Sequence, residues 1–165
     1  MKKIILAFAV VVMLAAGAIG LLGQREAAPE VRFATLSGER LATSDLRGKV
    51  VLVNFWATSC VACLKEMPRM AETYKKFAPR GYEMIAVAMS YDHPNEVARY
   101  ATTRGLPFKV ALDGDGAIAR GFGNIRATPT SFLIDRNGRI LKQYVGEPEW
   151  SEFHTLVEEA LGNPV

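Results

Sequence analysis

Cysteine and histidine are scarce in this chain, which has two of each among its 165 residues. A zinc site prefers about four nitrogen or sulfur ligands, so Cys60 and Cys63 supply half a set, and no second cysteine cluster exists. His93 and His154 lie far from the cysteines and from each other in the sequence, so we predict surface histidines rather than ligands. Residues 113–116 (DGDG) resemble part of a calcium loop, but no oxygen ligand follows, so a turn is predicted. The sequence therefore predicts no resident metal ion and no cofactor.

The chain also carries little net charge, because 20 basic and 17 acidic residues leave +3. Without Lys2 and Lys3, which precede the domain, 18 basic residues face the same 17 acidic ones. A domain that binds nucleic acid usually gathers positive charge on one face or along one helix. This near balance gives no electrostatic reason to expect a nucleic-acid partner.

Charged side chains are absent from residues 4–23, a run dominated by Ile, Leu, Val, Ala and Phe. A helix of this length crosses the roughly 30 Å hydrocarbon layer of a bilayer, and Lys2 and Lys3 are expected to stay inside. A cleaved signal peptide is the alternative, because residues 16–18 (AGA) resemble a small-residue cleavage site. The run exceeds the usual signal-peptide core of about 7–15 residues, which favours a retained anchor over residues 1–23.

Both alternatives place the rest of the chain outside the cytoplasm. We predict a single-pass N-terminal anchor in the cell membrane with the domain on the periplasmic or extracytoplasmic side. If the segment is cleaved, the domain is periplasmic. Residues 24–30 (QREAAPE) are polar and contain proline, which predicts a linker, and residues 31–165 form one soluble domain without internal repeats.

Strand and helix patterns alternate along this domain. Residues 50–56 are a continuous β-branched and aromatic run, as expected of a central strand covered on both faces, and Asn137-Gly138 marks a tight hairpin turn. Hydrophobic periodicity and boundary residues predict the other elements. The predicted strands cover residues 31–41 (as a hairpin), 50–56, 82–90, 108–112, 130–135 and 139–145, and the predicted helices cover 60–77, 95–104, 117–122 and 150–161. This order predicts an α/β fold with a mixed central sheet flanked by helices.

The two cysteines form a C-x-x-C pair, Cys60-Val61-Ala62-Cys63, where the central strand turns into a helix. Such a motif beside a βαβ pattern is a redox signature. Unpaired N–H groups and the positive end of the helix dipole stabilise a thiolate at Cys60. Cys63 lies on the same face one turn deeper, so the two sulfurs can close a small ring. We predict that Cys60 attacks a partner and that Cys63 resolves the mixed disulfide.

Other roles for the pair are weaker. A structural disulfide across so short a loop removes little chain entropy, so it would stabilise the fold only weakly. A peroxidatic cysteine is the other alternative, but peroxiredoxin-type sites carry a proline and a threonine where this chain has Val53 and Ala57.

Two segments resemble one family. Residues 48–68 (GKVVLVNFWATSCVACLKEMP) and 127–135 (ATPTSFLID), the latter followed by Asn137-Gly138, are similar to the TlpA/ResA/CcmG group of thioredoxin-like proteins. The resemblance spans the soluble domain from about residue 31 to 161 and includes the N-terminal anchor. It implies a thioredoxin-like fold and a thiol–disulfide oxidoreductase that reduces protein disulfides.

The resemblance also implies roles for single residues. Glu66 matches the acidic residue of the active-site helix, which would exchange a proton with Cys63; a solvated surface carboxylate is the alternative. Pro129 matches a cis-proline that packs against the C-x-x-C motif, although the residues alone do not decide the isomer. Thr128 would then pair with the substrate backbone. Trp56 is a candidate for the docking surface, with a core position as the alternative.

This sequence departs from the family pattern in the active-site segment. Asn54 stands where thioredoxins carry a buried aspartate, as is usual in this group, so it cannot accept the proton. Ser59 replaces a tryptophan, and Val61-Ala62 lacks the proline that is common between the cysteines. Residues between the cysteines strongly affect the reduction potential, so the redox poise is left open.

Partners follow from the same resemblance. The substrates would be protein disulfides, with apocytochrome c before haem attachment and copper-site assembly proteins as candidates. A membrane thiol–disulfide carrier of the DsbD/CcdA kind would supply electrons. The alternative function is a Cu(I) chaperone for respiratory oxidase assembly, in which the same two thiols hold the metal.

Overall fold

The computed structural model describes residues 25–162, so the predicted anchor over residues 1–23 lies outside the described residues. Among the described residues, none of the helices combines the length and apolar character needed to cross a bilayer. The strands are β1 (Arg32–Ala34), β2 (Arg40–Ala42), β3 (Val50–Trp56), β4 (Tyr82–Ala88), β5 (Lys109–Leu112), β6 (Thr130–Ile134) and β7 (Ile140–Val145). The helices are α2 (Val61–Phe77), α3 (Pro94–Arg104), α4 (Ala117–Gly121) and α5 (Trp150–Leu161), with 3₁₀ turns at Thr43–Leu46 and Ala78–Arg80.

Five strands form the central sheet in the order β5-β4-β3-β6-β7. Strand β3 runs parallel to β4 and antiparallel to β6, so the sheet is mixed as predicted. Strands β1 and β2 form a separate antiparallel pair. This arrangement places the C-terminal ends of β3 and β4 and the start of β6 at the same end of the sheet.

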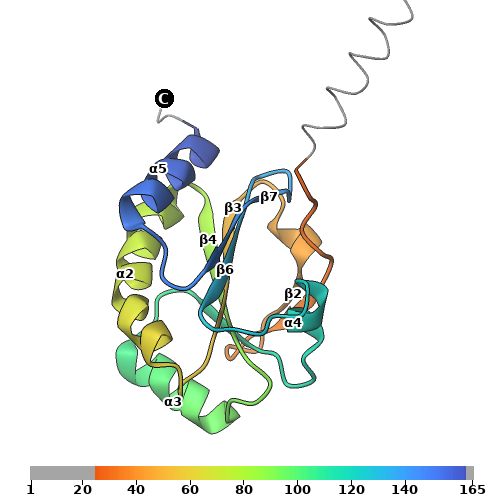
Figure 1. The fold of residues 1–165 in the computed structure, drawn as a ribbon, viewed down its shortest axis with the longest axis vertical. Coiled ribbons are helices and arrows are strands. Elements are labelled where there is room, and N and C mark those ends of the chain that lie inside the picture. Colours follow the sequence, from red (N-terminus) through yellow and green to blue (C-terminus); the bar gives the residue numbers. More distant parts are fainter. Residues whose placement is uncertain (1–24, 163–165) are drawn as a thin grey trace, which may run out of the picture.

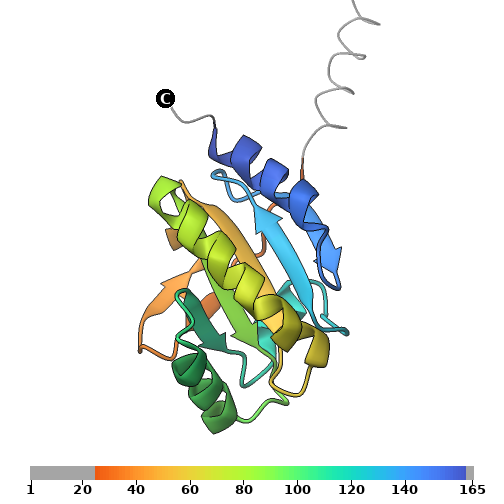
Figure 2. The ribbon, with the colours of Figure 1, turned by 90° about the vertical axis from the view of Figure 1, so that its left-hand side faces the viewer.

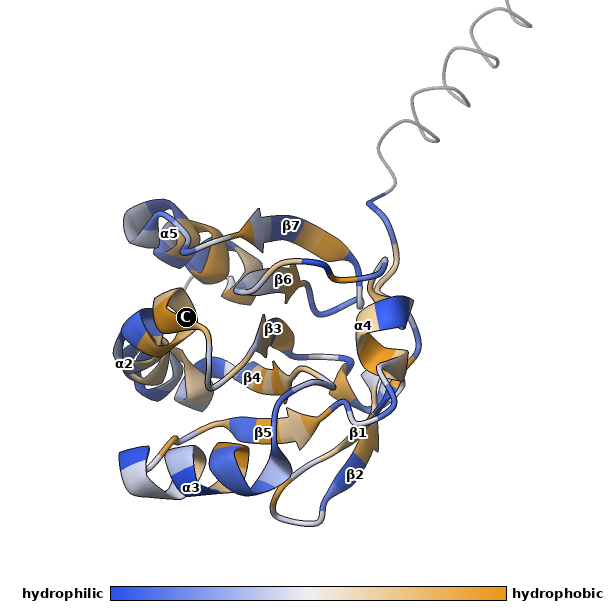
Figure 3. Cartoon of the chain, turned by 60° about the horizontal axis from the view of Figure 1, so that its bottom comes forward, coloured by the Kyte–Doolittle hydropathy of each residue, from blue (hydrophilic) through white to orange (hydrophobic). Residues whose placement is uncertain are grey.

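Helices cover the sheet on both faces. Helices α2, α3 and α5 lie on one face, whereas α4 and the β1–β2 pair lie on the other (Figure 1). Helix α2 crosses the middle of its face, with α5 and α3 on either side (Figure 2). Figure 3 shows hydrophobic residues in the strands between these layers and hydrophilic residues on the outer sides of α2 and α3.

The alternation along β3 divides its side chains between two cores. Leu52 and Trp56 belong to a core shared with α2, α3 and α5, and Val53 and Phe55 belong to one shared with β1, β2 and α4. All seven residues of β3 are buried. A strand covered on both faces explains the continuous apolar run in the sequence.

The predicted element boundaries agree with the observed ones to within about two residues. The Asn137-Gly138 turn forms as expected, with Gly138 at φ 72°, a conformation that favours glycine. The predicted turn at residues 113–116 also forms. There the buried Asp113 carboxylate accepts the N–H groups of Ile118 and Ala119 at 2.9 Å each, which fixes the start of α4.

The described part of the predicted linker is attached to the domain. Ala27 forms an antiparallel bridge with Arg139, and the Ala28 N–H donates to the Gly138 carbonyl at 2.9 Å. The Ile140 N–H donates to the Glu26 carbonyl at 2.8 Å. The chain therefore joins the domain beside the β6–β7 turn, at the end of the sheet opposite the start of α2 (Figure 1).

Candidate active site

The two cysteines stand at the start of α2, directly after the central strand. Cys60 is the N-cap residue, and its Sγ accepts the Cys63 N–H at 3.2 Å. The side chains are joined in a disulfide whose Cα atoms lie 5.3 Å apart. Cys60 is half-buried, whereas Cys63 is fully buried. Only Cys60 therefore offers its sulfur to a partner.

The helix start supplies the electrostatics that a reactive thiolate needs. The Cys60 carbonyl already accepts the first helical hydrogen bond, from the Leu64 N–H at 3.1 Å. The N–H groups of the first turn lack helical acceptors and carry the positive end of the dipole, which favours negative charge on Cys60.

Glu66 lies one turn beyond Cys63, and its side chain is fully buried. Its Oε1 accepts the Asn54 Nδ2–H at 3.1 Å, and the same amide donates to Ser131 Oγ at 2.9 Å. Asn54 comes from β3 and Ser131 from the neighbouring β6, where the two residues are register partners. The alternative of a solvated carboxylate is therefore wrong.

Burial raises the pKa of Glu66 to about 7, because removal from water disfavours the charged form. The Asn54 hydrogen bond lowers the pKa, and the negative charge of Glu147 raises it. Glu147 precedes α5 and accepts the Trp150 Nε1–H at 2.8 Å; Lys65 Nζ lies 3.9 Å from its Oε2. A carboxyl with this pKa can accept or donate a proton near neutral pH.

Asp92, in the segment between β4 and α3, holds the residues that precede Cys60. Its carboxylate accepts the Thr58 N–H at 2.6 Å and the Thr58 hydroxyl at 2.5 Å. It also accepts the His93 N–H at 3.1 Å. The turn from Ala57 to Cys60 is thus fixed to the segment that follows β4. Residue types alone did not reveal this contact, because the partners are 34 positions apart.

Pro129 and Thr128 lie at the same end of the sheet, just before β6. The Thr128–Pro129 peptide bond is cis, as the family resemblance implied. Pro129 is buried and its carbonyl accepts the Gly146 N–H at 2.8 Å, whereas Thr128 is partly exposed. Thr130 at the start of β6 pairs with Phe55 of β3, which brings this segment beside the strand that leads to Cys60.

The docking role predicted for Trp56 is wrong. Its side chain is fully buried, and its ring packs against Tyr100 of α3 at a centroid distance of 5.4 Å. The exposed apolar side chains at this end are instead Val61, Tyr91 and Val145, which are 82%, 64% and 70% exposed. Sequence patterns missed Tyr91 and Val145, since an isolated apolar residue carries no sign of its exposure.

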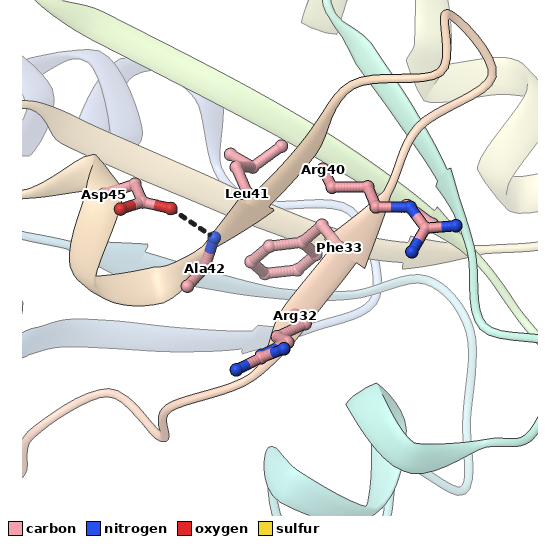
Figure 4. A pocket seen from close by; sticks show the side chains of 7 residues that line it. Arg32, Phe33, Arg40, Leu41, Ala42 and Asp45 are labelled. Carbon is pink, nitrogen blue, oxygen red and sulfur yellow. Dashed lines mark hydrogen bonds between the residues drawn. The ribbon is translucent and has the colours of Figure 1, made fainter.

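The histidines stand apart from the cysteines. His93 is exposed and accepts the Asn95 N–H, while His154 is partly buried and lies 2.9 Å from Thr73 Oγ1. Within residues 25–162, no group of three or more His, Cys, Asp or Glu side chains is placed to hold a metal ion. A pocket of about 390 Å³ over β1 and β2 is lined by Phe33, Leu41 and neighbouring residues and does not include the cysteines (Figure 4).

Comparison with known proteins gives consistent matches. Residues 23–159 match the protein family described as Redoxin. Over 120 residues the chain is 39% identical to the thiol-disulfide oxidoreductase ResA of Bacillus anthracis, covering 73% of this chain and 68% of that protein. It is 35% identical to the Bacillus subtilis protein of the same name over 127 residues, covering 77% and 70%. The thiol:disulfide interchange protein of the thioredoxin family from Chlorobium tepidum superposes with a TM-score of 0.76 at 31% identity, covering 85% and 99%.

Proposed function

Because this chain belongs to the Redoxin family and is a thioredoxin-like thiol–disulfide oxidoreductase, we propose that it reduces disulfides in proteins outside the cytoplasm. One observation carries the proton transfer in this proposal. Glu66, with a pKa of about 7, lies buried one turn from the buried Cys63. Reduction of a substrate requires that the resolving thiol lose its proton, and this carboxyl can take it.

The first step is attack by the more exposed sulfur. The Cys60 thiolate attacks one sulfur of the substrate disulfide, forming a Cys60–substrate bond and releasing the other substrate sulfur as a thiolate that takes a proton from water. Thr128 and the neighbouring Pro129 lie where the substrate backbone docks beside Cys60.

The second step resolves the mixed disulfide. The Cys63 thiol gives its proton to the Glu66 carboxylate and attacks Cys60 Sγ, and the second substrate sulfur leaves as a thiolate. The Cys60–Cys63 disulfide forms, so two electrons have passed to the substrate. Asn54 and Ser131 hold Glu66 in place during this transfer.

For repeated turnover, the Cys60–Cys63 disulfide must be reduced again by an electron donor in the same compartment. We propose that residues 4–23 anchor the chain in the cell membrane, with the domain outside the cytoplasm. A membrane thiol–disulfide carrier of the DsbD/CcdA type reduces the Cys60–Cys63 disulfide. Apocytochrome c before haem attachment is the proposed substrate, and maintenance of other exported protein thiols is the wider form of this role. The family resemblance of residues 48–68 and 127–135 supports these assignments.

Trapping tests the proposal. The Cys63→Ala variant cannot resolve a mixed disulfide, so Cys60 should stay joined to its substrate in cells. Partners recovered under non-reducing conditions are then identified by mass spectrometry. The Cys60→Ala variant is the matched control, because it retains one thiol of the pair and lacks the attacking sulfur.

Recovery of exported proteins with Cys63→Ala alone supports the reductase role, and apocytochrome c among them supports the specific substrate. Equal recovery with both variants, or adducts confined to cytoplasmic proteins, contradicts the proposal. Loss of haem-loaded cytochrome c in cells that carry only Cys60→Ala is the corresponding phenotype.

A further inference from the structure

Arginine side chains gather at the end of the domain opposite the disulfide. They come from four separate segments: the start of the described chain, the turn before β3, the 3₁₀ turn after α2 and the β6–β7 turn, which supplies two of them. We call this group the arginine end; it consists of Arg25, Arg47, Arg80, Arg136 and Arg139. The C-terminal end of α5 lies at the same end of the molecule (Figure 1).

Hydrogen bonds tie these side chains to neighbouring backbone. Arg139 donates to the Arg25 carbonyl at 2.9 Å, and Arg47 donates to the Asn137 carbonyl. Two further bonds run to the end of α5, from Arg136 to the Leu161 carbonyl at 2.8 Å and from Arg80 to the Gly162 carbonyl at 3.0 Å. A guanidinium has about five N–H donors, so each group keeps donors for a further ligand.

Within residues 25–162, none of these five guanidinium groups forms a salt bridge with a carboxylate. The Asp135 carboxylate accepts the N–H groups of Asn137 and Arg139 at 2.9 Å each. Glu158 pairs with Lys76 at 3.0 Å, and the positive charge of Arg80 also helps to lower the pKa of Glu158. The hydrogen bonds to backbone carbonyls hold the arginine side chains in place. Such arginines are preorganised for phosphate, because the planar donor fork of a guanidinium matches two phosphate oxygens.

The attachment of the N-terminal segment limits how the domain can turn. Glu26 is hydrogen-bonded to the start of β7 and Ala28 to the β6–β7 turn, so the chain leaves the domain from within the arginine end. Only Gln24 and Arg25 then separate these bonded residues from the apolar run over residues 4–23. A tether this short keeps the arginine end near the point where the apolar run ends.

We propose that the arginine end rests on the phosphate groups of anionic phospholipids and holds the disulfide away from the membrane. This inference rests on the proposed anchoring by residues 4–23. The contact would combine the tether with bidentate arginine–phosphate pairing, and attraction to an anionic lipid surface is worth about 1 kcal/mol per basic residue.

The fold fixes the height of the disulfide in this orientation. Strand β3 runs seven residues from the arginine end toward Cys60, a rise of roughly 23 Å. Helix α2 returns over 17 residues, roughly 25 Å. Substrate and electron donor must therefore present their cysteines on the order of 25 Å above the lipid phosphates, which selects protein segments that project from the membrane or are free of it.

Hydrogen exchange of the full chain in vesicles tests the orientation. Vesicles of phosphatidylcholine alone are compared with vesicles that also contain phosphatidylglycerol. We expect amide exchange in residues 45–49 and 135–139 to slow only with phosphatidylglycerol and to recover in high salt. Exchange in residues 91–96, near the disulfide, should not change.

Two matched triple variants separate the arginine end from general charge. R25Q/R136Q/R139Q removes three charges from it, and R40Q/R99Q/R104Q removes three exposed arginines elsewhere. The first should lower the ratio of docked to undocked domain on the order of a hundredfold, and the second should leave it unchanged. A third variant, R25K/R136K/R139K, keeps the positive charge and should restore most of the protection from exchange.

Protection that is independent of phosphatidylglycerol, or equal loss in both triple variants, overturns the proposed contact. Alkaline extraction of the membranes reports separately on the anchor. If the chain is extracted, the proposed anchoring fails, and flotation with phosphatidylglycerol vesicles at low salt still decides whether the arginine end binds lipid. A contact with a membrane protein instead would show as protection only in native membranes.

Discussion

The side-chain amide of Asn54 donates to Oε1 of Glu66 over 3.1 Å and so joins the central strand to the active-site helix. The same Nδ2 also donates to Ser131 Oγ, which ties the neighbouring strand to the pair. An amide carries no charge, so Glu66 is the only carboxyl in this three-residue group. In the proposed mechanism, Glu66 takes up the proton that Cys63 releases in the resolving step.

Replacing Glu66 by Gln should slow the resolving step. Gln keeps the size and an oxygen for the Asn54 amide but cannot take a proton from Cys63. We expect disulfide exchange that depends on Cys63 to fall on the order of a hundredfold, while alkylation of the reduced Cys60 is unchanged. Stopped-flow measurement of mixed-disulfide decay checks the result. Glu72→Gln, on an exposed position of the same helix, is the control, and an equal loss in both variants would contradict the role.

The raised pKa of Glu66 also predicts how stability depends on pH. The folded oxidised protein holds this proton up to about pH 7, whereas the unfolded chain releases it near 4.5. The stabilisation is therefore complete below pH 4.5 and is lost as the pH rises through 7. Relative to Glu66→Gln, the wild type should lose on the order of 3 kcal/mol between pH 4 and pH 8. Urea unfolding at both pH values measures the difference, and a constant difference would exclude the buried proton.

Replacing Asn54 by Asp should shift the pH dependence of turnover upward. The change removes the N–H that favours the ionised Glu66 and adds a second carboxyl beside it, and both effects raise the pKa of Glu66. We expect the pH midpoint of the Cys63-dependent step to rise by about one unit or more. Ser131→Ala leaves the Asn54–Glu66 bond in place and should shift the midpoint much less. A midpoint that moves downward would contradict the arrangement.

Removing the Asp92 carboxylate should loosen the turn that precedes Cys60. Asp92→Ala leaves the Thr58 N–H and hydroxyl without their acceptor, at a cost of roughly 3 kcal/mol in unfolding free energy. The thiolate reactivity of Cys60, measured by the pH dependence of alkylation, should change as well, since the turn positions the helix N-cap. Asp92→Asn keeps one oxygen acceptor, so its unfolding free energy and its Cys60 reactivity should lie between those of the wild type and Asp92→Ala. Full reactivity in Asp92→Ala would show that the turn holds its shape unaided.

Introducing proline between the cysteines should be tolerated at one position only. Val61 is the first residue of α2 and follows Cys60 at φ −90°, ψ 101°, an extended conformation that suits a residue before proline. Val61→Pro should raise the unfolding free energy by about 0.5–1 kcal/mol by restricting the unfolded chain. Ala62→Pro forces the helical Val61 out of its conformation and should destabilise instead. Thermal unfolding of both variants tests the contrast.

Much of the fold follows from local signals in the sequence. The buried run over β3 and the Asn137-Gly138 turn predict their elements because strand burial and turn geometry depend on neighbouring residues. The cysteine pair is equally local. Glu66 and Pro129 came from the family resemblance; the structure places Glu66 one turn beyond Cys63 and Pro129 just before β6, whose first residue pairs with Phe55.

The contacts that complete the site could not be predicted in this way. Asn54 and Ser131 meet across 77 positions, and Thr58 and Asp92 across 34, so the partners are defined only once strands β3, β4 and β6 pair. The docking role predicted for Trp56 was wrong for a related reason. Helix α3 covers its ring, and no sequence pattern near Trp56 indicates this contact.

The exposed surface around Cys60 is assembled from connecting segments and the end of β7, while the packed cores lie on the two faces of the sheet. Ser59 and Tyr91 are exposed and belong to two different connections, and the exposed Val145 ends β7. Substitutions there leave β3, Asn54 and Glu66 in place. Partner preference in this lineage can therefore drift by single steps during evolution while the electron-transfer chemistry is inherited intact.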